Sequence, residues 1–189
     1  MDLTDRIAVN RLEPARRADF FRLHSAAHGA DWCFCCAWWV ETWDGWGERS
    51  AAQNRAVRED LLDRGEYDGY LLYLDGAPVG WCQAGPRDRL VKLTRQFALP
   101  ADPAAWAITC FLIAPAVRGQ GLAAHLLRAV LTDLWVRGAA RVEAFPKRGP
   151  DLDSRDLWNG PEAMFRAAGF IVVADDPVRP VLAITRPAR

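Results

Sequence analysis

The sequence lacks long apolar runs, net charge and, almost completely, lysine. No stretch approaches the roughly 20 consecutive apolar residues that cross a bilayer, and residues 1–6 do not show the charged-then-apolar layout of a signal peptide. The 24 basic side chains balance 24 acidic ones, so no overall field holds the protein on nucleic acid or on an anionic membrane. We therefore expect a cytoplasmic protein that binds neither nucleic acid nor membranes.

Paired cysteine spacings are also missing. The five cysteines are Cys33, Cys35, Cys36, Cys82 and Cys110. An odd number without regular spacing favours reduced thiols over a disulfide framework. His24 and His28 stand four residues apart before the first three cysteines and could complete a zinc site with them on paper. Zinc sites use two spaced pairs of ligands, and adjacent residues such as Cys35 and Cys36 point in different directions. We expect no metal.

The apolar pattern alternates between strand and helix periods with no break in composition, which predicts one mixed α/β domain over residues 1–189. Helical spacing covers residues 16–27, 50–64, 123–137 and 161–168. Strand patterns cover residues 6–12, 67–74, 78–85, 105–113, 141–145, 170–174 and 181–186. Ser50 is a good helix N-cap, and Asp75-Gly76 predicts a tight hairpin turn. Residues 86–103 show the least regular pattern.

Residues 110–123 carry the clearest chemical signal. They read Cys-Phe-Leu-Ile-Ala-Pro-Ala-Val-Arg-Gly-Gln-Gly-Leu-Ala, which predicts a strand, a glycine-containing turn and the start of a helix. A helix N-terminus exposes unpaired N–H groups and a partial positive charge. Glycine lets a ligand approach those groups closely, and Arg118 adds a charge-assisted contact. The segment therefore predicts a pyrophosphate site, the alternative being a plain turn that needs glycine for its geometry.

Two cofactor classes use such a turn. Gly119 to Ala124 fits the G-x-G-x-x-A dinucleotide fingerprint, and Glu143 follows about 20 residues later, where a ribose-binding acid belongs. Residues 114–118, however, separate the first glycine from its strand, and the 46 residues after Glu143 cannot complete a doubly wound sheet. The sequence also contains no G-x-x-x-x-G-K-[ST] segment, which disfavours a nucleoside triphosphatase.

The second class fits better. Arg118-Gly119-Gln120-Gly121-Leu122-Ala123 resembles the R/Q-x-x-G-x-G/A signature of the GNAT superfamily of acyl-coenzyme A dependent N-acetyltransferases. Residues 164–170, Met-Phe-Arg-Ala-Ala-Gly-Phe, are similar to the late helix of that family, which ends in Gly-Phe before a strand. Cys110-Phe111 and the sequence Glu-Ala-Phe-Pro at 143–146 are similar to a large bacterial branch of it. With the order of elements, the resemblance covers most of the chain.

The resemblance implies a mostly antiparallel, twisted sheet of six or seven strands, flanked by helices, in which two central parallel strands splay apart. It implies that backbone amides of Arg118, Gly119, Gln120, Gly121, Leu122 and Ala123 hold the pyrophosphate of coenzyme A. Main-chain groups of Leu112, Ile113 and Ala114 would pair with the pantetheine arm. Acetyl-coenzyme A would be the co-substrate, with its thioester in the splay.

The resemblance also implies roles in acetyl transfer. The acceptor amine must lose a proton, and Glu143 is the candidate base because it lies on the second strand of the splay; the alternative is a salt bridge to an arginine. The family often protonates the leaving thiolate with a tyrosine, where this chain has Phe165. A thiol of pKa about 8.5 can leave without a dedicated acid. Asn159 lies one residue from the common asparagine position of the family.

Five of the nine tryptophans fall between residues 32 and 46, where the resemblance places the acceptor pocket. Trp38 and Trp39, with Cys110 on the cofactor strand, are therefore candidate acceptor contacts. Such rings suit a cationic or aromatic amine at roughly 0.5 to 2 kcal/mol per cation–π contact. The alternative is that they only cover the core beneath a long loop.

These observations predict an acetyltransferase that moves an acetyl group to a primary amine of a small molecule by direct attack in a ternary complex. Two alternatives stay open: a non-catalytic domain that binds or senses acyl-coenzyme A, since Phe165 replaces the tyrosine, and a protein or peptide N-acetyltransferase. A homodimer is compatible with the resemblance.

Overall fold

The computed structural model describes residues 3–26, 32–153 and 155–187, so the predicted role of His28 lies outside the described residues. Seven strands form one sheet in the order β1-β2-β3-β4-β5-β7-β6. Their bounds are β1 Ile7–Arg11, β2 Tyr70–Leu74, β3 Ala77–Pro86, β4 Ala105–Ile113, β5 Arg141–Ala144, β6 Ile171–Ala174 and β7 Val181–Thr185. Every neighbouring pair is antiparallel except β4 and β5. The predicted mixed, mostly antiparallel sheet with one parallel pair is confirmed.

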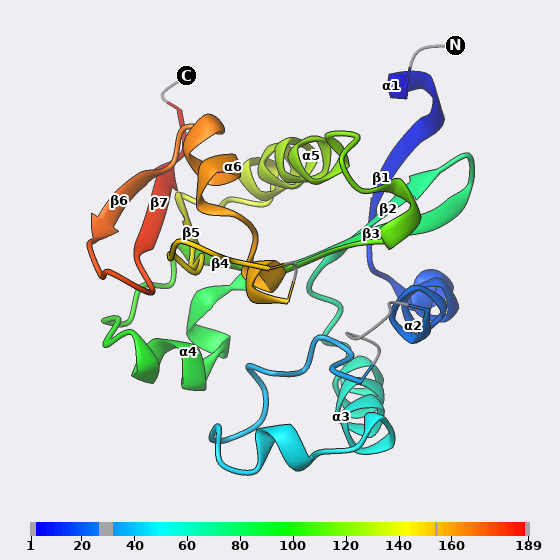
Figure 1. The fold of residues 1–189 in the computed structure, drawn as a ribbon, viewed down its shortest axis with the longest axis horizontal. Helices are drawn as coiled ribbons and strands as arrows, with labels where there is room; N and C mark the ends of the chain where they lie inside the picture. Colours follow the sequence, from blue (N-terminus) through cyan, green and yellow to red (C-terminus); the bar gives the residue numbers. More distant parts are fainter. Residues whose placement is uncertain (1–2, 27–31, 154, 188–189) are drawn as a thin grey trace.

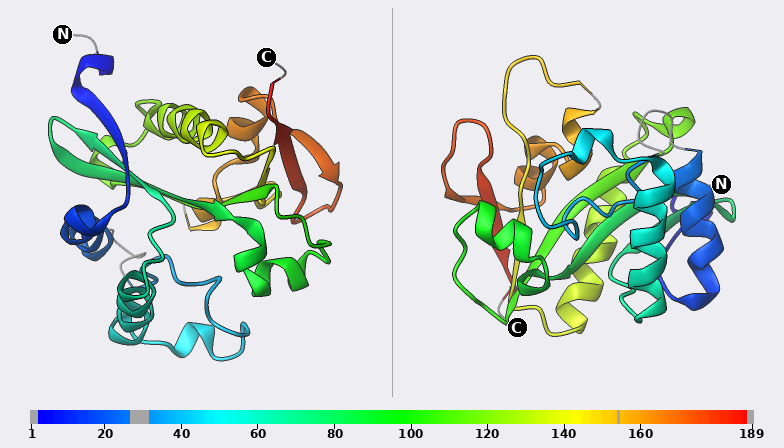
Figure 2. Two further views of the ribbon diagram at one scale, coloured as in Figure 1. Left: turned by 180° about the vertical axis from the view of Figure 1, so that it is seen from behind. Right: turned by 90° about the horizontal axis from the view of Figure 1, so that it is seen from below.

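Helices cover both faces of this sheet (Figures 1 and 2). The helices are α1 Leu3–Arg6, α2 Arg17–Ser25, α3 Ala51–Asp63, α4 Val91–Gln96, α5 Leu122–Val136 and α6 Glu162–Ala167. Short 3-10 turns are η1 Pro14–Arg16, η2 Trp46–Glu48, η3 Arg87–Arg89, η4 Pro115–Val117 and η5 Asp156–Asn159. Helices α5 and α6 lie on one face, whereas α2, α3 and α4 lie on the other. None of these helices is long and apolar enough to cross a membrane.

Local sequence signals set several element boundaries. The Ser50 hydroxyl accepts from the amide of Gln53, and the Gln53 side chain accepts from the amide of Ser50, which completes a capping box at the start of α3. Asp75 and Gly76 have φ of 49° and 79°, as a tight hairpin between β2 and β3 requires. Helix α4 was not predicted, because its six residues are too few to show a helical period.

The splay follows from the unequal lengths of the two parallel strands. β4 pairs with β5 only from Ala105 opposite Arg141 to Ile108 opposite Ala144. β5 then ends, and Phe145 turns into a separate buried cluster with Leu93 and Val181. Among the described residues, β4 continues to Ile113 with a partner strand, β3, on one side alone. The second half of β4 therefore presents an open edge.

Trp81 sits at the centre of the core between the sheet and α2. It is fully buried on β3, and its ring packs edge to face against Phe20. A Cβ atom added to Gly69, whose φ is +145°, would lie 2.1 Å from the Trp81 ring. Only glycine fits here, because both the backbone conformation and the space exclude a side chain.

Gly69→Ala should therefore lower the free energy of unfolding by roughly 2 to 4 kcal/mol, since it adds overpacking to backbone strain. Gly138→Ala is the matched control, because Gly138 has φ of +93° with nothing within 4 Å of an added Cβ. Urea unfolding of both variants separates the cost of overpacking against Trp81 from the cost of backbone strain. Equal losses in the two variants would contradict the proposed collision with Trp81.

Candidate functional site

A cavity of about 880 Å³ lies along the open edge of β4. Its walls come from β4, the turn between β4 and α5, the segment between α2 and α3, the connection from β5 to α6, and the loop before β7. Nine predicted site residues line it: Trp38, Cys110, Leu112, Ile113, Arg118, Gly119, Gly121, Leu122 and Ala123. Ala114, Gln120, Trp39, Glu143, Asn159 and Phe165 do not. The fold thus brings the glycine turn and part of the tryptophan segment to one cavity.

The glycine turn opens the N-terminus of α5 toward this cavity. Gly119 and Gly121 have φ of 78° and 75°, and an added Cβ at either would meet nothing within 4 Å. Gly121 is the N-cap and supplies no side chain to the first amides of α5, which runs for 15 residues. Free amides at a helix N-terminus attract an anion. This geometry suits a phosphate group.

Arg118 spans the turn. Its Nε donates to the carbonyl oxygen of Ile113 at 2.9 Å, its only side-chain hydrogen bond within the described part of the chain. The contact holds the turn against the end of β4 and leaves the terminal nitrogens of the guanidinium for a ligand.

The register of β4 decides which of its main-chain groups face the gap that opens between β4 and β5. The Ala114 amide donates to the carbonyl oxygen of Val79 at 2.8 Å, on the β3 side. Because N–H and C=O directions alternate along a strand, Leu112 also faces β3, opposite Trp81, whereas Phe111 and Ile113 face the gap. The predicted pantetheine contacts through the main chains of Leu112 and Ala114 thus point to the wrong side of β4, while that at Ile113 points to the gap.

Asn159 and Arg179 close the gap between β4 and β5 at the point where the two strands part. The Asn159 Nδ2 donates to the carbonyl oxygen of Thr109 at 3.0 Å, one residue beyond the last pairing with β5. A terminal nitrogen of Arg179 donates to the Asn159 Oδ1 at 3.3 Å. Asn159 is fully buried, so it positions β4 and Arg179. Arg179 and Trp158, which both line the cavity, were missed: nothing near Arg179 in the sequence signals a site, and beside Trp158 only Asn159 was a candidate.

Phe165 belongs to the core. Its side chain is fully buried, and its ring packs edge to face against Phe111 at 5.9 Å and Phe170 at 5.2 Å between centroids. Gly160 has no side chain and so leaves room for the Phe165 ring, because a Cβ atom at Gly160 would lie 2.9 Å from that ring. Phe165 does not line the cavity, so this geometry gives no support to its predicted contact with a cofactor.

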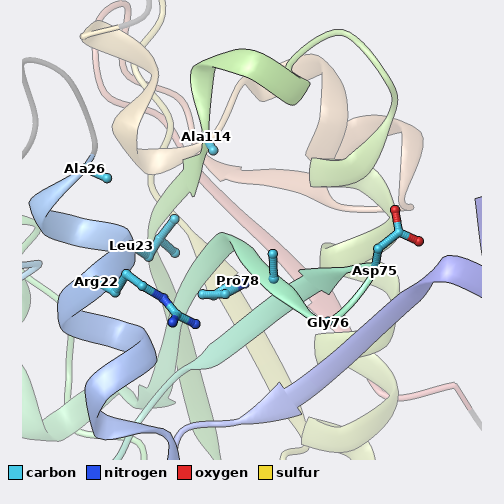
Figure 3. A pocket seen from close by; sticks show the side chains of 8 residues that line it. Arg22, Leu23, Ala26, Asp75, Gly76, Pro78 and Ala114 are labelled. Carbon is cyan, nitrogen blue, oxygen red and sulfur yellow. The ribbon is translucent and has the colours of Figure 1, made fainter.

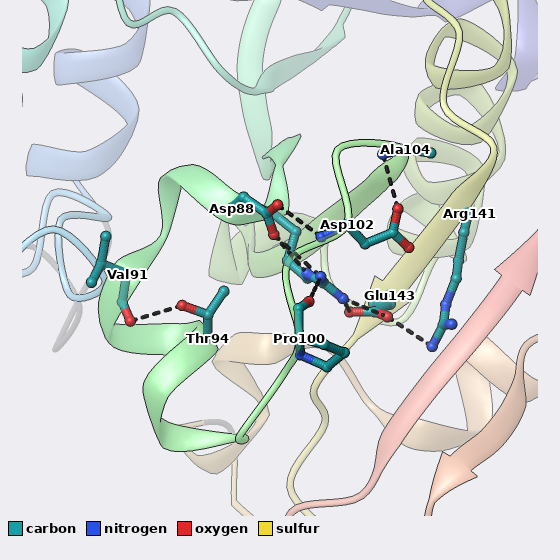
Figure 4. A network of polar contacts seen from close by, with 9 residues as sticks. Asp88, Val91, Thr94, Pro100, Asp102, Ala104, Arg141 and Glu143 are labelled. Carbon is teal, nitrogen blue, oxygen red and sulfur yellow. Dashed lines mark hydrogen bonds and ion pairs between the residues drawn. The ribbon is translucent and has the colours of Figure 1, made fainter.

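Glu143 forms a buried ion pair instead of facing the cavity (Figure 4). Its carboxylate is fully buried, and both of its oxygens lie 3.1 Å from a terminal nitrogen of Arg87. Arg141 contacts the same carboxylate at 2.8 Å. Arg87 also bonds Asp88 and the carbonyl oxygen of Pro100. Of the two predicted roles, the geometry favours the salt bridge and gives no support to the base.

Arg58 organises the tryptophan segment from below. It is completely buried and donates to the carbonyl oxygens of Phe34 and Cys35. These two residues have φ of 45° and 52°, a left-handed backbone that residues with a side chain rarely adopt. The ring centroid of Trp39 lies 4.8 Å from the guanidinium carbon of Arg58, and Trp39 does not line the cavity. The buried cation therefore fixes the shape of the wall.

Lys92 lies in an aromatic cage formed by Trp38, Trp43 and Trp46. Its Nζ lies 3.4 Å from the ring centroid of Trp43, with Trp46 at 5.6 Å and Trp38 at 5.9 Å. It also donates to the carbonyl oxygen of Thr42 at 3.3 Å. Burial lowers the pKa of Lys92 to about 8. Trp38, a predicted acceptor contact, thus faces a cation of the protein together with Trp43 and Trp46.

Three thiols, those of Cys33, Cys35 and Cys110, reach the cavity wall. Burial raises the pKa of Cys33 to about 12. Burial opposes ionisation of Cys35 as well, but its contacts with Cys110 and His24 and the charge of Arg58 lower its pKa. Within the described ranges, no group of three or more His, Cys, Asp or Glu side chains has the arrangement of a metal site.

A second cavity, of about 520 Å³, lies between α2 and the β2–β3 hairpin (Figure 3). Its charged side chains are Arg22, which pairs with Asp19, and Asp75, which pairs with Arg6. Ala114 faces this cavity and not the larger one. With its charges already satisfied, this hollow lacks the groups that a reaction needs.

Glu143→Gln should lower the free energy of unfolding by about 3 kcal/mol, because it removes the buried counter-charge of Arg87 and leaves only the pair with the more exposed Asp88. Glu66→Gln is the control, since Glu66 pairs with Arg64 at a partly exposed site, where such a pair contributes about 1 kcal/mol at most. Urea unfolding at neutral pH measures both. Full stability of the Glu143 variant together with loss of activity would restore the role of base.

The pKa of Lys92 predicts a pH dependence of stability. The folded pKa of about 8 lies below the usual 10.5, so the unfolded chain binds more protons between these two values. Stability should therefore rise with pH from about 8 to 10.5 relative to Lys92→Met, which has no ionisable group there. Urea midpoints of both proteins across this range test the sign. If the difference in stability between the two proteins stays constant or falls with pH, the pKa of Lys92 is not depressed.

The chain matches known proteins by family and by fold. Residues 32–159 match the family model of the Acetyltransferase (GNAT) family. No curated protein matches. Among solved structures, an aminoglycoside acetyltransferase in complex with coenzyme A superposes with a TM-score of 0.60 at 19% identity, over 95% of each chain.

Two further solved structures match this chain over nearly their whole length. The PaiA N-acetyltransferase of Thermoplasma acidophilum, in complex with coenzyme A, gives a TM-score of 0.56 at 10% identity, over 95% of this chain and 99% of that one. The ribosomal-protein-S18-alanine N-acetyltransferase of Escherichia coli gives a TM-score of 0.52 at 13% identity, over 95% of this chain and 93% of that one. At these identities the likeness establishes the fold.

Proposed function

Because the chain belongs to the GNAT acetyltransferase family, we propose that it transfers an acetyl group from acetyl-coenzyme A to a primary amine of a small molecule. The observation that carries this proposal is the single cavity, which joins an anion-binding turn, an unpaired strand edge and an aromatic wall. The first two features suit the cofactor and the third suits an acceptor.

The residues present fit coenzyme A. The amides at residues 119–123 and the free nitrogens of Arg118 would hold its pyrophosphate at the N-terminus of α5. The unpaired C=O group of Phe111 and the N–H of Ile113 would bind the amide groups of its pantetheine arm. Bound there, acetyl-coenzyme A supplies the activated acyl group as a thioester.

The open edge also provides the donor that acyl transfer needs. A main-chain N–H of Phe111, fixed by the pairing of β4 with β3, would polarise the thioester carbonyl as an amine attacks it. Removing such a donor costs about 2.7 to 4 kcal/mol of transition-state stabilisation in a studied enzyme. Direct attack by the amine then forms the amide bond and expels the thiolate of coenzyme A.

The attacking amine must also lose a proton. Within the described residues, no Asp or Glu lines the cavity, whereas His24 does. The Nδ1 of His24 lies 2.9 Å from the carbonyl oxygen of Phe20, which fixes the proton there and leaves Nε2 as the accepting nitrogen. That nitrogen is buried without exposed surface, so water in the cavity would take the proton, in place of Glu143.

Arg118→Ala should weaken coenzyme A binding about 10-fold, the loss expected for one charge-assisted contact. Calorimetry measures this, and Arg128→Ala on the exposed side of α5 is the control. Thiol release from acetyl-coenzyme A is followed in parallel over amino acids, simple amines, polyamines, aminoglycosides and peptides. No coenzyme A binding by the wild-type protein would overturn the proposal, and binding without turnover on any acceptor would favour the sensing alternative.

A further inference from the structure

We infer that the acceptor carries a carboxylate beside its amine, and that Arg179 binds this carboxylate while the body of the acceptor lies against Trp38 and Trp158. This inference rests on the proposed acetyltransferase function and specifies its substrate class as an amino carboxylate with an apolar or aromatic body. It replaces the expectation that the tryptophan wall attracts a purely cationic amine.

The charge of the cavity wall points to an anionic group. Its described lining includes Arg118, Arg155 and Arg179 and contains no Asp or Glu. Lys92, in the aromatic cage behind Trp43, adds a further positive charge. A polycationic acceptor would meet these like charges and no carboxylate in the described lining, which disfavours its binding.

Two of the three arginines have other partners. Arg118 is tied to the Ile113 carbonyl at the glycine turn. Arg155 lies on the outside, with an 82% exposed side chain paired to Asp153. Arg179 is half-buried, and within the described part of the chain its side chain contacts the neutral amide of Asn159 and no carboxylate. Burial lowers the pKa of Arg179, and the charge of Asp156 opposes this only in part. An incoming carboxylate would offset the cost of burying this guanidinium.

The position of Arg179 separates it from the phosphate end of the cofactor. Through Asn159 it is held at Thr109, where β4 and β5 part. Arg118 is held at Ile113, four residues further along the same strand, which corresponds to about 13 Å. A pyrophosphate on the glycine turn is thus at the far end of the open edge. The anion at Arg179 belongs to the acceptor.

The cavity that Arg179 lines also has an aromatic wall. Trp38 and Trp158 both line the cavity, with ring centroids 5.9 Å apart and planes inclined by 31°. Trp38 is only 5% exposed, so its ring is fixed in place. A flat or branched apolar group fits against such rings, whereas a strongly hydrated chain would lose its water there.

Matched acceptors test the carboxylate directly. With acetyl-coenzyme A, we expect kcat/KM for phenylalanine to exceed that for phenylalaninamide and phenethylamine at least 10-fold, with spermidine and kanamycin poorer still. Arg179→Gln should raise KM for phenylalanine at least 10-fold with little change in kcat or in KM for acetyl-coenzyme A. It should leave phenethylamine unaffected. Arg179→Lys should restore part of the loss, and Arg186→Gln, on an exposed residue just beyond β7, is the control.

Each other outcome overturns the inference. Turnover that favours the amines without a carboxylate would disprove the substrate class while the acetyltransferase function stands. A raised KM for acetyl-coenzyme A in Arg179→Gln would assign Arg179 to the cofactor. If no acceptor turns over, calorimetry of N-acetylphenylalanine and its amide in the presence of coenzyme A decides: Arg179-dependent preference for the acid supports the inference, and its absence rejects it.

Discussion

The unpaired edge of β4 is the constraint on which the site depends. A sheet strand whose neighbour ends halfway leaves main-chain donors and acceptors without partners, and these groups have to be satisfied by something else. The protein satisfies the two ends itself, through Asn159 at Thr109 and Arg118 at Ile113. The stretch between them, at Phe111, stays available. The edge is therefore pinned at both ends and open in its middle, where an extended ligand can pair with it as an added strand.

Buried arginines hold the irregular parts of the chain around this edge. Arg58 binds the carbonyl oxygens of two left-handed residues beneath the tryptophan segment, and Arg87 joins Glu143 on β5 to Pro100 in the connection before β4. A guanidinium offers five N–H groups in a plane and can tie several segments together, which the single ammonium of a lysine does less well. The near absence of lysine thus matches a structural use of arginine, while Lys92 fills a place that aromatic rings surround.

Sequence patterns predicted what is local. The capping box at Ser50, the hairpin turn at Asp75 and the glycine turn before α5 depend on neighbouring residues, and each lies where the pattern indicated. The register of β4 could not be predicted, because a shift by one residue exchanges the groups that face the gap. A salt bridge from Glu143 to an arginine was one of the two predicted roles, but its buried partner and that of Arg179 could not be identified: Arg87 is 56 positions away from Glu143, and Asn159 is 20 positions from Arg179. Only the folded chain brings them together.

The indole rings of the cavity wall form a continuous row. Trp158 lies against Trp38, Trp38 against Trp43, Trp43 against Trp46 and Trp46 against Trp32, with centroids 4.9 to 6.0 Å apart. Each ring limits the rotamers of the next, so the wall is ordered before a ligand arrives, and binding loses less side-chain entropy. The same preorganisation has a consequence for selectivity. A wall of interlocked rings, without the pliable methionines that let promiscuous surfaces repack, distinguishes ligands by shape and tolerates few alternatives.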